Sequence, residues 1–133
     1  MTGAASLDAN VLARLTLKDV PAAFERAKSL VSRPDAQFQV SGLALTEYVF
    51  ALDNHYGLTR DQITAMVRGV LSLPNVTSSC PFVDAVLEAW TAHPALSWAD
   101  CYLAAAAEAA GLTPLWSFDK KLARQSTAAS LVP

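Results

Sequence analysis

The sequence predicts an α/β fold with a mainly parallel sheet that is flanked by helices on both faces. Short apolar segments alternate along the chain with longer segments of helical periodicity, an order typical of parallel strands that are joined by helices. The chain has 133 residues, a usual size for one domain. Because no repeat, low-complexity stretch or Gly/Ser linker interrupts the sequence, we expect residues 1–133 to form a single domain.

Residues that favour helix starts mark the elements of the N-terminal half. Pro21 suits the first turn of a helix, Ser41 is a favourable N-cap, and Thr59 opens a capping-box pattern. Residues 7–12 (LDANVL) are short and apolar, whereas residues 2–6 are weak for a strand. The expected elements are a strand over residues 7–12 that runs into a helix, a helix over 20–32, a strand over 38–40, a helix from 42 to about 55, a helix from 60 that Pro74 closes, and a strand over 75–78.

Residues that favour helix starts and helix ends also mark the elements of the C-terminal half. Ser97 caps an alanine-rich helix, and Gly111 stops it. The expected elements are a helix over residues 81–92, a helix over 98–110, a strand over 115–117, a helical turn over 119–124 and a strand over 129–132.

Composition narrows the class of protein. Apolar residues make up 53% of the chain and charged residues 17%, which excludes disorder. No apolar run reaches the roughly 18 residues of a membrane span, and residues 1–6 lack the features of a signal peptide, so we expect a cytoplasmic protein. Cys80 and Cys101 are expected to be small buried hydrophobes. The net charge of −2 argues against a broad nucleic-acid surface held by charge alone, but not against a local basic rim.

Four carboxylates form the candidate site, each at or near a point where an apolar segment meets an expected helix: Asp8, Glu47, Asp100 and Asp119. Asp8 and Asp119 fall just after candidate strands, where sites form in open parallel sheets. Converging carboxylates repel one another and need a cation, and their hard oxygen atoms favour Mg²⁺ or Mn²⁺. Such a metal lowers the pKa of a bound water and stabilises charge on a phosphodiester.

Each acid also has an ordinary structural interpretation. Asp100 fits the third position of a capping box that begins at Ser97. Asp119 can cap the last short helix, and Asp8 can be a turn residue after a strand. Glu47 is harder to explain in this way, because the helical period places it beside apolar side chains.

Polar and basic neighbours complete the candidate site. Asn10 and Ser117 each stand two residues from an acid and can hydrogen-bond a ligand water or carboxylate. Lys121 fits a helix face that is exposed to solvent. His55 stands near the C-terminal end of an expected helix, where a histidine commonly interacts favourably with the helix dipole. The candidate contacts to a substrate phosphate are Arg14, Lys18, Lys120 and Arg124.

These contexts resemble the PIN-domain family, and most of all the VapC-type ribonuclease toxins of prokaryotic toxin–antitoxin pairs. The family's first motif resembles residues 7–12, and its helical Glu corresponds to Glu47 within residues 46–49 (TEYV). The motif before the long alanine-rich helix resembles residues 96–105 (LSWADCYLAA), and the last motif resembles residues 115–122 (LWSFDKKL). Two departures are Ala9, where Thr is common, and Ser117, which replaces Thr but keeps the hydroxyl.

The resemblance covers nearly the whole chain and implies a three-layer α/β/α sandwich. It also implies metal-dependent endonucleolytic cleavage of RNA with Mg²⁺ or Mn²⁺, in which Asp8, Glu47, Asp100 and Asp119 hold the metal and are catalytic. The implied partners are RNA, a small VapB-like antitoxin protein and a second copy of the chain in a homodimer. The apolar composition also favours a homodimer, with the helices over 20–32 and 41–55 as the favoured contributors.

Two other functions stay open at this point. One is a PIN-like module that binds RNA or a protein without cleaving it, and metal-stimulated RNA cleavage separates it from a nuclease. The other is a metal-dependent phosphatase or DNA nuclease on a similar fold. The lack of an Asp-x-Asp motif after Leu7 counts against the phosphatase.

Overall fold

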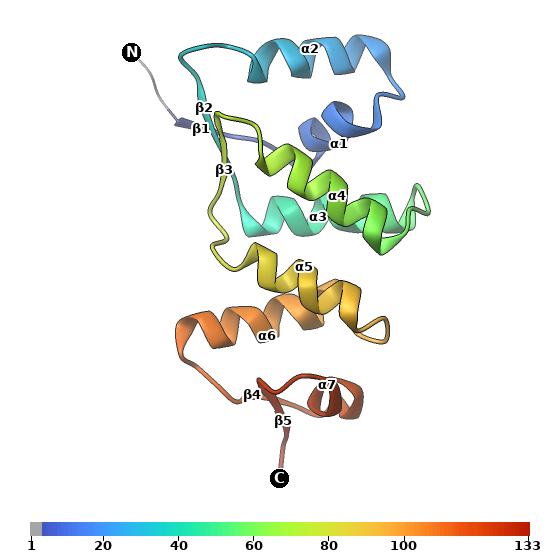
Figure 1. Cartoon of the computed structure of the whole chain (residues 1–133), viewed down its shortest axis with the longest axis vertical. Helices are drawn as coiled ribbons and strands as arrows, with labels where there is room; N and C mark the ends of the chain where they lie inside the picture. Colours follow the sequence, from blue (N-terminus) through green and yellow to red (C-terminus); the bar gives the residue numbers. More distant parts are fainter. Residues whose placement is uncertain (1–3) are drawn as a thin grey trace. The chain divides into compact units, whose positions relative to one another are not determined.

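The computed structural model describes residues 4–133, and the chain divides into two compact units, Met1–Cys80 and Pro81–Pro133 (Figure 1). Residues 1–3, which begin the segment used for the signal-peptide expectation, lie outside the described residues. The expectation of a single domain stays a prediction. Among residues 4–133, no helix has the length and apolar character needed to cross a membrane.

Parallel strands form the sheet of the N-terminal unit. The strands β1 (Ala4–Ser6), β2 (Gln37–Val40) and β3 (Val76–Ser78) pair in the order β1-β2-β3. Both pairings are parallel. Phe38 and Val40 of β2 are buried, whereas the intervening Gln39 is exposed, as expected for side chains that alternate between two faces of a strand.

The expected position of the first strand is wrong. Residues 4–6 form β1, and residues 7–12 instead lead into the helix α1 (Ala9–Leu17), for which Asp8 is the N-cap. Pairing outweighs weak intrinsic propensity here, because β1 lies directly against β2 and the N–H of Leu7 donates to the C=O of Gln39 over 3.1 Å. The helix begins early because the C=O of Asp8 accepts the N–H of Val11.

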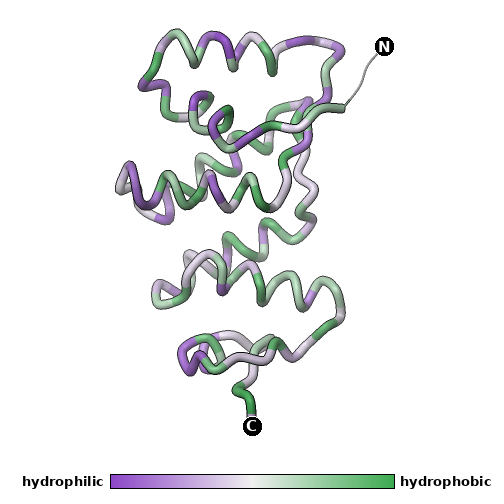
Figure 2. Tube along the Cα trace, turned by 180° about the vertical axis from the view of Figure 1, so that it is seen from behind, coloured by the Kyte–Doolittle hydropathy of each residue, from purple (hydrophilic) through white to green (hydrophobic). Residues whose placement is uncertain are grey.

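The other helices of this unit begin where capping chemistry predicts. Pro21 lies in the first turn of α2, the Ser41 hydroxyl accepts the N–H of Ala44, and Thr59 and Gln62 form a complete capping box. Hydrophilic and hydrophobic residues alternate along α2 (Figure 2), in keeping with a helix that is buried on one side. The bounds are Pro21–Val31 for α2, Gly42–Asn54 for α3 and Arg60–Leu71 for α4.

Helix α3 carries much of the core of the N-terminal unit. Leu45, Val49 and Leu52 are buried on one face, as the helical period predicts. Tyr48 is also buried, at 0% exposure, and its hydroxyl lies 2.7 Å from that of Thr16 in α1. Burial raises the pKa of Tyr48 to about 12, with the hydrogen bond to Thr16 acting in the lowering direction.

The C-terminal unit has two packed helices and a small parallel sheet. Helix α5 packs on α6, and the ring of Trp90 meets the ring of Trp98 edge-on, with 5.4 Å between centroids. Helix α7 contacts both strands of the parallel pair β4-β5. The bounds are Val83–Ala92 for α5, Trp98–Ala110 for α6, Leu115–Ser117 for β4, Lys120–Gln125 for α7 and Ala129–Leu131 for β5.

The predicted fold class is confirmed as a mixed α/β fold with parallel strands. In the described part of the chain every strand pairing is parallel, and the strands pair as a set of three in one unit and a set of two in the other. Cys80 and Cys101 are buried, as expected.

Candidate functional site

Asp8 lies just beyond the carboxyl end of β1 and begins α1. Its Oδ1 accepts the N–H of Ala9 over 2.8 Å, and the side chain is exposed. The carboxylate therefore stands at the positive end of the α1 helix dipole. The position after the strand is that of the sequence-based prediction, although the strand itself is earlier.

Glu47 lines a cleft of about 470 Å³ between α1 and α3. Asn10 of α1 lines the same cleft, so the fold brings the predicted polar neighbour of Asp8 to Glu47. Phe50 lies there too and is 64% exposed. Glu47 is exposed beside apolar surface, as the helical period predicts.

Asp100 has the structural role that the capping-box pattern indicates. Its N–H donates to the hydroxyl of Ser97 over 3.1 Å, and its Oδ2 accepts the N–H of Ser97 over 3.2 Å. The side chain is half-buried in the first turn of α6. A carboxylate in this place stabilises the helix whatever else it does.

Asp119 is the N-cap of α7. Its Oδ1 accepts the N–H groups of Lys121 and Leu122, over 2.9 and 3.2 Å. The hydroxyl of Ser117 accepts the N–H of Asp119 over 3.0 Å. The predicted neighbour Ser117 thus acts on the backbone of Asp119 and fixes the turn that presents its carboxylate.

The four carboxylates divide between the two units. Asp8 and Glu47 belong to the N-terminal unit, and Asp100 and Asp119 belong to the C-terminal unit. Within either unit, as far as residues 4–133 are concerned, no three His, Cys, Asp or Glu side chains gather closely enough to hold a metal ion. A site made of all four therefore needs both units and stays a prediction.

The predicted phosphate contacts of the N-terminal unit have partners of their own. Arg14 forms an ion pair with Asp19 at 3.0 Å and donates to the hydroxyl of Tyr56 over 3.1 Å. The ammonium group of Lys18 lies 5.3 Å from the centre of the Phe24 ring. Lys18 follows the end of α1, roughly 15 Å along the axis from Asp8 at a rise of about 1.5 Å per residue, so it stands away from that carboxylate.

Lys120 and Arg124 lie on α7, directly after Asp119. Both side chains are exposed, so their charges are open to a ligand. Lys121 is exposed as well, in agreement with the expected solvated helix face.

Comparison with protein families decides the class of the chain. The family model of the PIN domain matches residues 5–127, a range that spans both units. The chain belongs to the PIN-domain family. PIN domains are generally nucleases that use divalent metal ions. No individually curated protein matches the chain.

The hard donors of this PIN domain suit a divalent cation. Asp8 and Glu47 are exposed carboxylates, and carboxylate oxygen is the ligand that Mg²⁺ and Mn²⁺ prefer. Asn10 and His55, which line the Glu47 cleft, offer oxygen and nitrogen atoms rather than sulfur. No Cys is among the described residues that line this cleft.

Sequence reasoning missed three residues of this PIN domain that line clefts beside the carboxylates. His55 is the C-cap of α3, as expected, but it also lines the Glu47 cleft, two helical turns further along α3. Arg26 and Arg33 line a second cleft, which reaches Asn10. Arg33 lies beyond the end of α2 at Val31, so no helical spacing in the sequence linked it to Arg26.

Proposed function

We propose that this PIN domain is a metal-dependent endoribonuclease of the VapC toxin type, which hydrolyses RNA phosphodiester bonds and is inhibited by a VapB-like antitoxin. The observation that carries the proposal is the complete acidic set in a chain of this family. Three of its members, Asp8, Asp100 and Asp119, lie in the first turn or at the N-cap of a helix. The fourth, Glu47, is exposed in a cleft.

In the proposal, Mg²⁺ or Mn²⁺ is held by Asp8, Glu47, Asp100 and Asp119. When bound, such an ion lowers the pKa of a water and neutralises charge on the attacked phosphate. Asn10 orients oxygen ligands from within the Glu47 cleft, and Ser117 holds the Asp119 turn by accepting its N–H.

The chain's own cations have a separate task. Lys120 and Arg124 are exposed on α7 and carry positive charge next to Asp119. They bind phosphate oxygens of the RNA and so position the strand. Arg14 is less suited to this role, since Asp19 already neutralises it.

Control by a partner protein is part of the same proposal. An inhibitor arginine fits among the carboxylates, because its guanidinium group pairs bidentately with a carboxylate and stays charged.

The proposal also includes a homodimer. Leu43 and Phe50 of α3 are 69% and 64% exposed, so apolar helix surface is available to pack against a second copy of the chain.

The direct test is RNA cleavage by the purified chain in Mg²⁺ or Mn²⁺. We expect cleavage by the wild type, its loss in EDTA, and its loss in the Asp100→Asn variant with the fold retained, because asparagine keeps a capping oxygen. RNA binding without cleavage in every metal contradicts the nuclease and supports the catalytically silent binding module. In cells, we expect toxicity that co-expression of the antitoxin relieves.

A further inference from the structure

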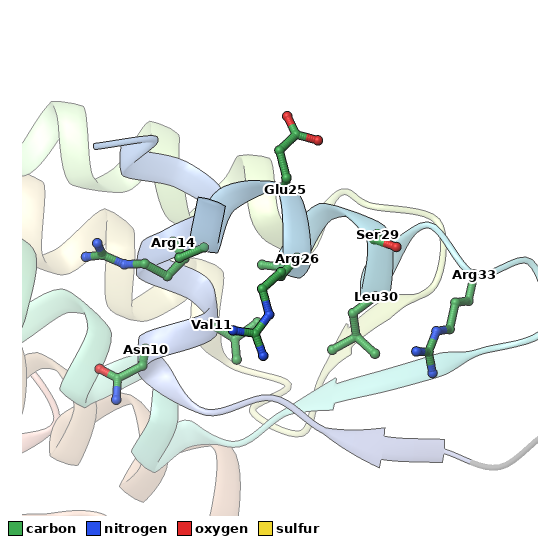
Figure 3. Close-up of a pocket in the computed structure, with 10 residues that line it drawn as sticks. Asn10, Val11, Arg14, Glu25, Arg26, Ser29, Leu30 and Arg33 are labelled. Atoms are coloured by element: carbon green, nitrogen blue, oxygen red, sulfur yellow. The ribbon is translucent and has the colours of Figure 1, made fainter. Parts of the chain in front are cut away.

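A cleft of about 650 Å³ lies between α1 and α2 in the N-terminal unit (Figure 3). Val11 of α1 and Ala27 and Leu30 of α2 are among the residues that line it, and these are buried or half-buried. Arg26 and Arg33 line it as well, and both are exposed. The cleft therefore has an apolar interior and a rim of guanidinium groups.

The charge of this rim is not balanced by the protein. Arg14 lines the cleft but is paired with Asp19. Arg26 and Arg33 form no ion pair within residues 4–133. Among the described residues that line the cleft, Glu25 is the one acid, and its carboxylate is directed away from Arg26 and Val11 (Figure 3). Two guanidinium groups are thus left for an anionic ligand.

The cleft shares one lining residue with the cleft of Glu47. Asn10 lines both the α1–α2 cleft and the Glu47 cleft. It is also two residues from Asp8, at the start of α1. A strand that occupies the Glu47 cleft can therefore continue past Asn10, around the N-terminal turn of α1, to the arginines.

We propose that the α1–α2 cleft binds the sugar–phosphate backbone of the RNA strand next to the cleaved bond, with Arg26 and Arg33 as its phosphate ligands. The inference rests on the proposed function. Guanidinium groups bind phosphate oxygens bidentately. RNA is favoured over an acidic peptide because a cleaved strand has to extend away from the carboxylates, and the shared residue Asn10 places the two clefts next to each other.

The second groove beside α2 offers a matched control. Lys18 and Lys28 line a cleft on the α4 side of α2 and both lie over the ring of Phe24, at 5.3 and 5.8 Å from its centre. The single variant Lys28→Gln, the lysine control, removes one positive charge from the same helix as its matched single variant Arg26→Gln. It leaves the proposed RNA cleft intact.

The experiment measures binding of a fluorescent single-stranded RNA of about 12 nucleotides by anisotropy, in EDTA so that no cleavage occurs. For the arginine variant Arg26→Gln/Arg33→Gln we expect about tenfold weaker binding at low salt. The slope of log Kd against log salt should fall by about 1.4, since each lost phosphate contact removes about 0.7 for a single strand. Arg26→Lys/Arg33→Lys should restore most of the slope. Arg26→Gln alone should lower the slope by about 0.7, whereas the lysine control should bind like the wild type.

Three results overturn the proposal. The first is that the arginine variant binds RNA as the wild type does. The second is that the lysine control loses as much RNA affinity as Arg26→Gln. The third is that the arginine variant still binds RNA but no longer binds a poly-glutamate peptide. The last result assigns the cleft to an acidic peptide. Circular dichroism checks the fold of each variant, and the lysine replacement keeps the test valid if the glutamine variant misfolds.

Cleavage kinetics separate this inference from the proposed function. With the RNA of about 12 nucleotides as substrate, the arginine variant should have a higher KM than the wild type and the same kcat. A dinucleotide is too short to reach the cleft, so the variant and the wild type should cleave it equally well. If the wild type cleaves no RNA but the variants change RNA binding as expected, the nuclease proposal fails and the proposal that the cleft binds RNA is supported. If the wild type cuts RNA and KM for the long substrate is unchanged, the cleft proposal fails alone.

Discussion

The acidic residues of the two units differ in how much structure depends on them. In the C-terminal unit, Asp100 accepts the N–H of Ser97, and Asp119 accepts two N–H groups at the start of α7. In the N-terminal unit, Asp8 accepts only the N–H of Ala9, and the carboxylate of Glu47 has no ion pair or hydrogen bond within the described residues. We therefore expect substitutions of Asp100 and Asp119 to lower both stability and the proposed activity, whereas substitution of Glu47 should lower the proposed activity alone.

The largest expected effect is on activity at Glu47. Glu47→Gln keeps the size of the side chain and removes a charge that no described residue compensates. We expect the cleavage rate to fall about a thousandfold, as for the loss of several kcal/mol of charge stabilisation in a metal site. The free energy of unfolding should change by less than about 0.5 kcal/mol, as for an ordinary surface substitution. Single-turnover kinetics and urea denaturation measure the two quantities.

Asp53→Asn is the matched control for this change, because Asp53 is an exposed acid on the same helix outside the Glu47 cleft. It should leave both the rate and the stability unchanged. A rate for Glu47→Gln equal to that of Asp53→Asn removes Glu47 from the site and ends the contrast between the units.

A smaller effect, on stability, is expected at Asp119. Asp119→Ala removes the acceptor for the N–H groups of Lys121 and Leu122 and should cost about 1–2 kcal/mol of unfolding free energy. Asp119→Asn keeps an acceptor oxygen and should cost less, while both variants lose cleavage. Urea titrations of the two variants measure the difference. Equal destabilisation by alanine and asparagine is incompatible with the capping role.

The last expected effect is confined to alkaline pH and tests the N-terminal core. The pKa of Tyr48 is about 12 in the folded chain and about 10 when the tyrosine is exposed on unfolding. The unfolded chain thus binds fewer protons than the folded chain between pH 10 and 12, so stability is full below pH 10 and falls across this window. Denaturation at a series of pH values should show the fall.

Tyr48→Phe is the corresponding variant. It should lose roughly 1 kcal/mol at neutral pH together with the hydrogen bond to Thr16, and its stability should vary less between pH 10 and 12. The same alkaline loss in the phenylalanine variant shows that other groups titrate and that Tyr48 is not the cause.

Local chemistry explains which parts of the fold were predictable. The hydroxyls of Ser41, Thr59 and Ser97 each accept a hydrogen bond from the backbone N–H of the residue three positions later. Because this interaction involves a single turn of the chain, the local sequence is enough to predict it. The three helices that these residues begin, α3, α4 and α6, were expected within a few residues of their observed bounds for this reason. The same locality made the capping role of Asp100 visible in the sequence.

Long-range packing decided what the sequence left open. Residues 4–6 form a strand because β2 pairs with them, and a small-residue segment gives no local sign of such a partner. Arg14 and Lys18 looked equally free in the sequence, but the fold brings Asp19 and Tyr56 to one and the Phe24 ring to the other.

By itself, the sequence determined the α/β class and the starts of α3, α4 and α6, because these depend on near neighbours and on residue type, whereas the acidic site stays a prediction. Only the tertiary structure decided that Asn10 and Glu47 share a cleft and that Arg26 and Arg33 rim the cleft next to it. The physical reason is that a cleft is made by helices packing side by side, and the contacts between α1 and its neighbours α2 and α3 join residues far apart in the chain.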